Sequence, residues 1–153
     1  MDPRFTGVIP PVVTPFLDGS VDLDSLDRLV DMLIGAGVDG LFLLGSSGET
    51  AYLTDSRREA VVARAVARAD GRVPVLAGAI DTTAPRVIEQ ARRAAAAGAD
   101  AVVATCPFYA LNDAAEIEDH FRAIGAAVDV PLFAYDVPVR LGGARPTADV
   151  LVR

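Results

Sequence analysis

The chain has 153 residues, a net charge of −7 and a mean hydropathy of +0.36, with 52% of its residues hydrophobic. Its acidic surface would repel phosphate backbones, which argues against nucleic-acid binding, and no apolar run reaches the ~18 residues of a membrane span. The single cysteine, Cys106, cannot form an internal disulfide, and the N-terminus lacks the pattern of a secretion signal, so we expect a cytoplasmic location.

Strand-like apolar runs alternate with helical patterns from the beginning of the chain. Residues 7–16 are interpreted as a first strand that runs into a loop. Aliphatic residues recur at helical spacing over residues 23–36, which predicts an amphipathic helix that ends near Gly37. Residues 40–45 form a short, wholly apolar run, which is typical of a strand buried on both faces.

The alternation continues through the rest of the chain. Three further strands are predicted, at residues 73–79, 101–106 and 131–137. Start signals precede the helices between them. Thr54 is positioned to cap one helix, Thr83 with Pro85 opens an alanine-rich helix, and Asp113 with Glu116 matches a capping box.

The spacing of these elements predicts an α/β fold. Each strand–helix unit spans roughly 30 residues, the size of a βα repeat, and regular βα alternation implies a parallel sheet with right-handed crossovers. Two architectures are compatible with this pattern: an open, doubly wound sheet and a (β/α)₈ barrel. Five strands suit the open sheet, whereas a complete barrel needs about 250 residues, so this chain would supply about five of its eight units.

In either architecture, chemistry is located where the parallel strands end. Polar segments follow the predicted strands at Thr14-Pro15 and at residues 45–50, 107–109 and 135–140. In residues 45–50 (GSSGET), two glycines bracket two hydroxyls, and glycine allows a tight turn whose N–H groups face one anion. A carboxylate or phosphate would fit there, although an ordinary Gly/Ser turn has the same composition.

Several single residues are candidates for chemistry or for packing. Tyr135 stands in an otherwise apolar strand, where its hydroxyl could shuttle a proton or simply reach the rim of the core. His120 is interpreted as a surface or packing residue of a helix, and Cys106 as a packing residue rather than a nucleophile. No spacing of His, Cys, Asp and Glu indicates a metal site, and no cofactor is expected.

Together these segments resemble those of the dihydrodipicolinate synthase and N-acetylneuraminate lyase family of class I, pyruvate-type aldolases. Residues 7–16 (GVIPPVVTPF) are similar to the family's opening GVxxPxVTPF, and residues 45–49 to its G-[ST]-[ST]-G-E loop. Residues 107–109 (PFY) are similar to P-[YF]-Y, and residues 135–138 (YDVP) to Y-N-[VI]-P. The motifs occur in order along the whole chain, and the resemblance favours a partial (β/α)₈ barrel over the open sheet.

The resemblance implies a role for each matching residue. Ser47, with the backbone of the turn through Gly48, would hold the carboxylate of a pyruvate-like keto acid. Tyr135 would donate and accept the proton during imine formation, and Ser46 and Tyr109 would relay it. In the synthases Tyr109 reaches a neighbouring subunit's site, which implies a homo-oligomer.

The chain also departs from the family pattern. Arg140 matches the position that attracts a second substrate's carboxylate in the synthases, but Asp136 replaces an asparagine and residues 139–142 differ from the usual SRTG, which leaves the substrate open. All 14 basic residues are arginine, so the family's imine-forming lysine, on strand six, is not present. We therefore expect residues 1–153 to be a single domain, the N-terminal part of a barrel truncated before strand six and inactive alone.

Three functions are compatible with these observations. The first is part of a Schiff-base lyase that condenses pyruvate with an aldehyde, cleaves such an aldol or dehydrates a sugar acid. The second is a non-catalytic module that binds a keto acid. The third is a structural subunit completed by a separate C-terminal chain. The expected partners are a small keto acid and either a second copy or a complementary C-terminal half.

Overall fold

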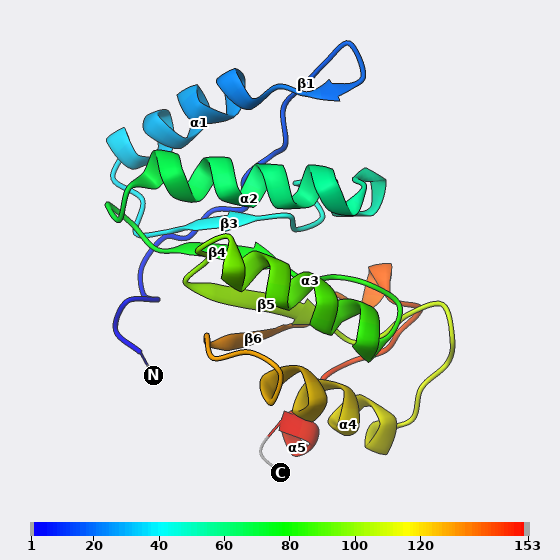
Figure 1. Ribbon diagram of the computed structural model, residues 1–153. Helices are drawn as coiled ribbons and strands as arrows, with labels where there is room; N and C mark the ends of the chain where they lie inside the picture. The colour runs from blue at the N-terminus through cyan, green and yellow to red at the C-terminus, as the bar shows by residue number, and fades with distance from the viewer. Residues whose placement is uncertain (1, 152–153) are drawn as a thin grey trace.

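The computed structural model describes residues 2–151 (Figure 1). Four parallel strands form one sheet in the order β3 (Leu41–Leu43), β4 (Val75–Gly78), β5 (Ala101–Thr105) and β6 (Leu132–Tyr135). The helices are α1 (Leu23–Gly35), α2 (Asp55–Ala69), α3 (Ala84–Ala96), α4 (Ala114–Gly125) and α5 (Ala148–Leu151). Smaller elements are the hairpin of β1 (Phe16–Leu17) and β2 (Ser20–Val21) and the 3₁₀ turns η1 (Thr50–Tyr52) and η2 (Pro138–Arg140).

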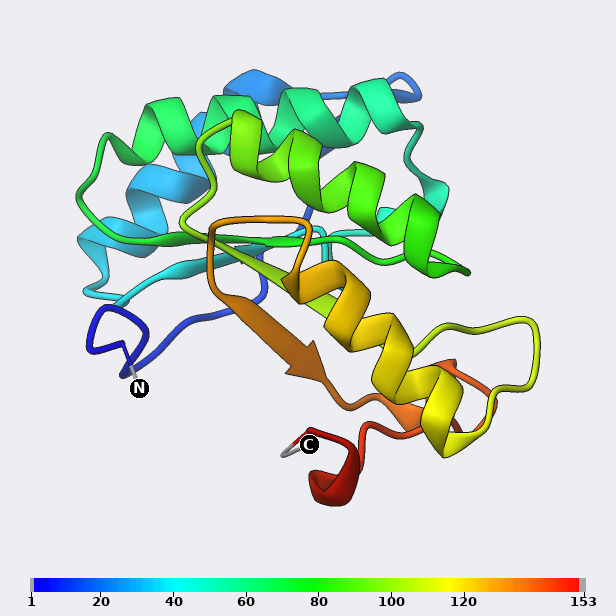
Figure 2. The same cartoon turned by 60° about the horizontal axis from the view of Figure 1, so that its bottom comes forward.

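Helices α1 to α4 cover one face of the sheet, each in contact with the next (Figure 2). The core between helices and sheet is mainly aliphatic and includes Leu26, Val61, Val87 and Ile124. An open, doubly wound sheet has helices on both faces and a reversal in strand order. Here the strands follow chain order, so the arrangement is part of a barrel wall, as the resemblance implied.

The other face of the sheet is concave. Side chains alternate along a strand, so Phe42 on β3 and Tyr135 on β6 both point away from the helices. Three interstrand steps would separate these strands by about 14 Å in a flat sheet. Their ring centroids lie 6.1 Å apart in an edge-to-face contact. The sheet is therefore strongly curved, as closure into a barrel requires.

The predicted first strand is the element that the structure corrects. Residues 7–16 run beside β3, and Val12 N–H donates to the Phe42 carbonyl at 2.8 Å while Phe42 N–H donates to the Pro10 carbonyl at 3.0 Å. Only one parallel bridge forms, between Pro11 and Phe42. Because Pro10 and Pro11 have no N–H to donate, no regular ladder develops and the segment is not a strand.

The other predicted elements are confirmed with narrower bounds. The capping box of Asp113 and Glu116 is present at the start of α4. Thr54 and Thr83 occupy the N-cap positions of α2 and α3, but neither hydroxyl makes a capping hydrogen bond. Asp22, which the sequence interpretation overlooked, caps α1 by accepting from Ser25 N–H at 3.0 Å. Among residues 2–151, no helix combines the length and apolar character needed to cross a bilayer.

The geometry predicts self-association of the chain. β6 pairs only with β5 within the described residues, so its other edge is open, and the concave face exposes parts of Phe42, Phe133 and Tyr135. Apolar parallel edges and uncovered aromatic surface promote association. Light scattering over a dilution series should therefore detect dimers or larger species. A monodisperse monomer at every concentration would contradict this prediction.

Candidate functional site

The turn after β3 presents free hydrogen-bond donors. The N–H groups of Gly48 and Glu49 bond back to the carbonyls of Gly45 and Ser46, at 3.1 and 3.2 Å. Within residues 2–151, the N–H groups and hydroxyls of Ser46 and Ser47 have no hydrogen-bond partner, and both residues are exposed. Successive free N–H groups at a turn make an anion site, so this segment is suited to a carboxylate.

Close backbone approaches explain the two glycines of this turn. A Cβ at Gly45 would lie 2.9 Å from the ring of Phe42, and one at Gly48 would lie 2.9 Å from the backbone nitrogen of Leu44. The turn is also strained, because Leu44 and Glu49 adopt φ angles of 57° and 55°. Packing around the turn therefore has to hold it in this conformation.

Two contacts, one buried and one partly buried, provide that support. The Thr14 hydroxyl donates to the Gly48 carbonyl at 2.7 Å. Arg58 on α2 donates from Nε and Nη2 to the Thr50 carbonyl, at 3.2 and 2.9 Å. The VTPF segment and α2 thus both hold the C-terminal half of the turn.

Asp81, after β4, extends this support. It is buried, lies 3.8 Å from Arg58 Nη1, and accepts from Arg86 Nε at 2.7 Å and from Thr82 N–H at 2.8 Å. Burial alone would raise the pKa of Asp81. The hydrogen bonds from Arg86 and Thr82 and the charge of Arg58 outweigh burial and hold its pKa below the ordinary value. The charged carboxylate connects the loops after β3 and β4 through Arg58.

Tyr135 lies at the same rim as the turn. It is the last residue of β6 and is half-buried, with its ring against Phe42. The Phe42 ring also lies against Gly45. The structure therefore places the serine turn and Tyr135 around one aromatic ring, at the carboxyl ends of β3 and β6.

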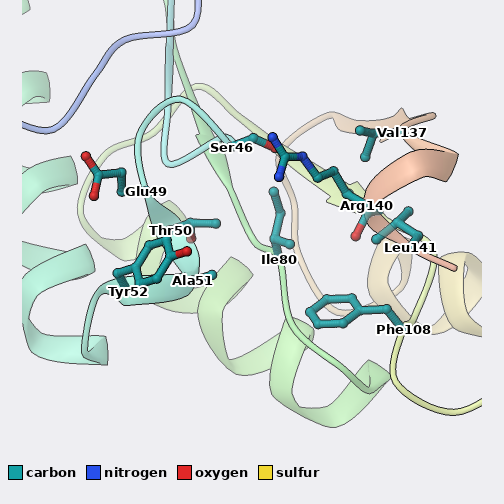
Figure 3. Close-up of a pocket in the computed structure, with 11 residues that line it drawn as sticks. Ser46, Glu49, Thr50, Ala51, Tyr52, Ile80, Phe108, Val137, Arg140 and Leu141 are labelled. Atoms are coloured by element: carbon teal, nitrogen blue, oxygen red, sulfur yellow. The ribbon is translucent and has the colours of Figure 1, made fainter.

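Arg140 joins this rim, whereas Tyr109 does not. Arg140 lies in η2, and its side chain extends toward Ser46 (Figure 3). Tyr109 is 99% exposed, with a φ angle of 78°, in the loop between β5 and α4. Within the described residues, Tyr109 therefore lies away from the serine turn and Arg140, with its side chain in solvent.

A cavity of about 360 Å³ opens between these loops, within the size range of small-ligand sites. Some of the residues that line it were predicted as site residues and others were not. The lining residues are Ser46, Glu49, Thr50, Ala51, Tyr52, Ile80, Thr105, Phe108, Val137, Arg140 and Leu141. Of the predicted site residues, Ser46 and Arg140 therefore share this cavity. Ser47, Gly48, Tyr135 and Tyr109 are not among its lining residues.

Two lining residues that the sequence interpretation missed are Thr50 and Thr105. Both are buried, and neither side-chain hydroxyl has a hydrogen-bond partner within the described residues. For Thr105, the available signal was the alternation of side chains along residues 101–106, which places it on the concave face.

His120 and Cys106 are packing residues. His120 is buried, so it is not a surface residue, and its Nε2 lies 3.0 Å from the Thr105 carbonyl. Burial lowers the pKa of His120, against the opposing effect of that contact. Burial and the charge of Asp136 raise the pKa of the Cys106 thiol to about 11. In residues 2–151, no cluster of three or more His, Cys, Asp or Glu could hold a metal ion.

A family model and individual relatives match this chain over most of its length. The model of the dihydrodipicolinate synthetase family matches residues 4–148. The 4-hydroxy-tetrahydrodipicolinate synthase of Phenylobacterium zucineum is 42% identical over 153 residues, covering 100% of this chain and 52% of that protein. YagE of Escherichia coli K12, named as a putative 2-dehydro-3-deoxy-D-gluconate aldolase, is 42% identical over 139 residues, covering 90% and 46%.

A solved structure supports the same relationship. The crystal structure of YagE in complex with pyruvate matches with a TM-score of 0.91 and 40% identity, covering 96% of this chain and 49% of that chain. The chain thus spans about half the length of the relatives that it matches.

The support of the turn can be tested at Thr14. Replacing Thr14 with Val removes the donor to the Gly48 carbonyl and leaves that buried oxygen unpaired. We expect the free energy of unfolding to fall by about 1–2 kcal/mol in urea denaturation. Thr14→Ser, which keeps the hydroxyl, is the matched control and should lose less. Equal stability of the two variants would mean that this hydrogen bond does not support the turn.

Proposed function

Because the chain belongs to the dihydrodipicolinate synthetase family, we propose that it is the keto-acid-binding part of a Schiff-base aldolase or lyase. The observation that carries the proposal is the convergence of three features at one rim of the curved sheet. These are the serine turn with its free donors, the Tyr135 side chain, and Arg140 at the cavity. Such a site would hold a small keto acid by its carboxylate.

In the proposed site, Ser46 and Ser47 bind the substrate carboxylate through their N–H groups and hydroxyls. Bonds from several donors to one ionised group are stronger than bonds between neutral groups. Arg140 adds a positive charge at the cavity rim, where it can pair with a second carboxylate. The apolar walls at Ile80 and Phe108 limit water around the keto carbon.

Tyr135 is the proposed acid–base residue. When a primary amine attacks the keto carbon, Tyr135 passes a proton from the nitrogen to the former keto oxygen. It then donates a proton to that oxygen, which leaves as water as the carbon–nitrogen double bond forms. The Phe42 ring fixes the orientation of the Tyr135 ring, and Ser46 relays protons between Tyr135 and solvent.

The attacking amine has to come from residues outside these 153. All 14 basic residues are arginine, and a guanidinium stays protonated and cannot attack the keto carbon. Tyr109 and Leu111, exposed by 99% and 95% on the loop after β5, are proposed to contact a second copy, where Tyr109 completes the proton relay. A complementary C-terminal segment would supply the amine and cover the open edge of β6.

The same observation supports a second candidate, a module that binds keto acids without turnover. The donors of the turn are complete within this chain, whereas the amine is not. The two functions differ in one measurable property. Borohydride reduction in the presence of pyruvate traps an imine only where a lysine takes part.

Pyruvate binding tests the part that both candidates share. We expect the chain to bind pyruvate in isothermal titration calorimetry, and the double change Ser46→Ala, Ser47→Ala to weaken binding at least about tenfold, because two donors to a carboxylate are lost. Ser20→Ala, in the exposed hairpin, is the matched control and should leave binding unchanged. Binding that survives the double change would exclude the turn as the carboxylate site.

Imine chemistry is tested by mass spectrometry and kinetics. Borohydride with pyruvate should leave no adduct on any side chain of these 153 residues, and an adduct on an internal peptide would contradict the proposal. Once a lysine-bearing C-terminal segment restores turnover, Tyr135→Phe should lower kcat by roughly 10²–10⁴ with little effect on pyruvate binding. An unchanged kcat would remove Tyr135 from the mechanism.

A further inference from the structure

Thr105 carries a buried hydroxyl that the protein leaves unpaired. The residue is 2% exposed, and its Oγ1 has no hydrogen-bond partner within the described residues. Its carbonyl has a partner, because it lies 3.0 Å from His120 Nε2. Burying a hydroxyl without a partner destabilises a fold, and such a group in a native structure calls for an explanation.

The position of Thr105 on β5 gives the direction of this hydroxyl. Ala101 and Val103, two positions apart, belong to the cluster on the concave face, whereas Val102 and Ala104 pack in the core under the helices. Thr105 continues the concave row and lines the cavity. The residue therefore forms part of the cavity wall, and its hydroxyl is covered in the empty site.

The neighbour of Thr105 in the sheet is Tyr135, its partner in the register of β5 and β6. Residues directly opposite in adjacent strands present their side chains on the same face. A keto acid whose keto carbon is next to Tyr135 would therefore have its following carbons within reach of Thr105.

The surrounding cavity wall indicates what kind of group fits. Ile80, Phe108, Val137 and Leu141 are apolar and offer no hydrogen-bond partner. The carboxylate of Glu49 points away from Ser46 and Arg140 (Figure 3), so no lining carboxylate is directed at an ammonium group in this space. A threonine hydroxyl can donate and accept, which matches a neutral hydroxyl.

We propose that Thr105 is a specificity-determining residue that hydrogen-bonds a hydroxyl group of the keto acid close to the keto carbon. The site thereby favours hydroxylated keto acids over pyruvate. The inference rests on the proposed function, since it assumes that a keto acid occupies the cavity. Thr50, the second buried threonine with an unpaired hydroxyl in the same wall, adds a further polar contact for such a chain.

The test compares pyruvate with 3-hydroxypyruvate, which carries one hydroxyl beside the keto carbon, by isothermal titration calorimetry. The unaltered chain should bind 3-hydroxypyruvate about three- to tenfold more tightly, the effect of one net hydrogen bond. Thr105→Val keeps the shape of the side chain and removes the hydroxyl. The ratio of the Kd for pyruvate to the Kd for 3-hydroxypyruvate should therefore fall to about one, while the affinity for pyruvate stays within about twofold of the parent. Thr105→Ser should retain the preference.

Thermal unfolding without ligand provides an independent measurement. Because the hydroxyl is unpaired in the empty site, Thr105→Val should raise Tm by about 2–4 °C. A variant that is less stable than the parent, or that fails to fold, would show that the protein itself uses the hydroxyl and would overturn the inference.

The outcomes separate the two proposals. If pyruvate binds but the preference for 3-hydroxypyruvate is absent, or persists in Thr105→Val, then Thr105 contacts only water and the inference is wrong while the keto-acid site stands. If neither keto acid binds the folded chain, the proposed function fails and the inference fails with it.

Discussion

The site depends on the curvature of the parallel sheet. Each strand directs alternate side chains to the helices and to the concave face, so only curvature can bring the ends of β3 and β6 together. The contact between Phe42 and Tyr135 is the direct sign of this curvature. Phe42 also lies against Gly45, and one aromatic ring thus sets the spacing between the serine turn and the proposed acid–base residue. In a flat sheet the same residues would be too far apart to act on one small molecule.

The serine turn is held in a strained conformation by groups from three other segments. Thr14 binds the Gly48 carbonyl, Arg58 binds the Thr50 carbonyl, and Asp81 pairs with Arg58 from the loop after β4. These contacts engage acceptors inside the turn and leave the N–H groups on its other side unoccupied. Arginine suits this arrangement because its guanidinium donates several hydrogen bonds in a fixed plane and keeps its charge when buried.

Sequence patterns predicted much of the fold, and the exceptions have physical causes. Hydrophobic periodicity located four strands because each is short, apolar and bounded by turn residues. It failed at residues 7–16, where Pro10 and Pro11 remove the donors that a ladder needs. The motif residues converge because parallel strands end at one rim. Thr105 was missed because a threonine within an apolar run is an ordinary strand former, and whether its hydroxyl is paired depends on tertiary contacts that periodicity does not report.

In the proposed mechanism, recognition of the substrate and attack on it depend on different parts of the protein. The turn, Tyr135 and Thr105 belong to the described residues, whereas the 153 residues include no lysine to provide a side-chain amine. The open edge of β6 ends at Tyr135, so a strand that paired with this edge would bring its own carboxyl end beside the proposed acid–base residue. The segment that covers the apolar edge of β6 would then also be the segment positioned to carry the amine. Pairing of that segment with β6 would therefore close the sheet and complete the proposed site in the same step. The buried, unpaired hydroxyls of Thr50 and Thr105 already belong to residues of the cavity wall within the described part of the chain.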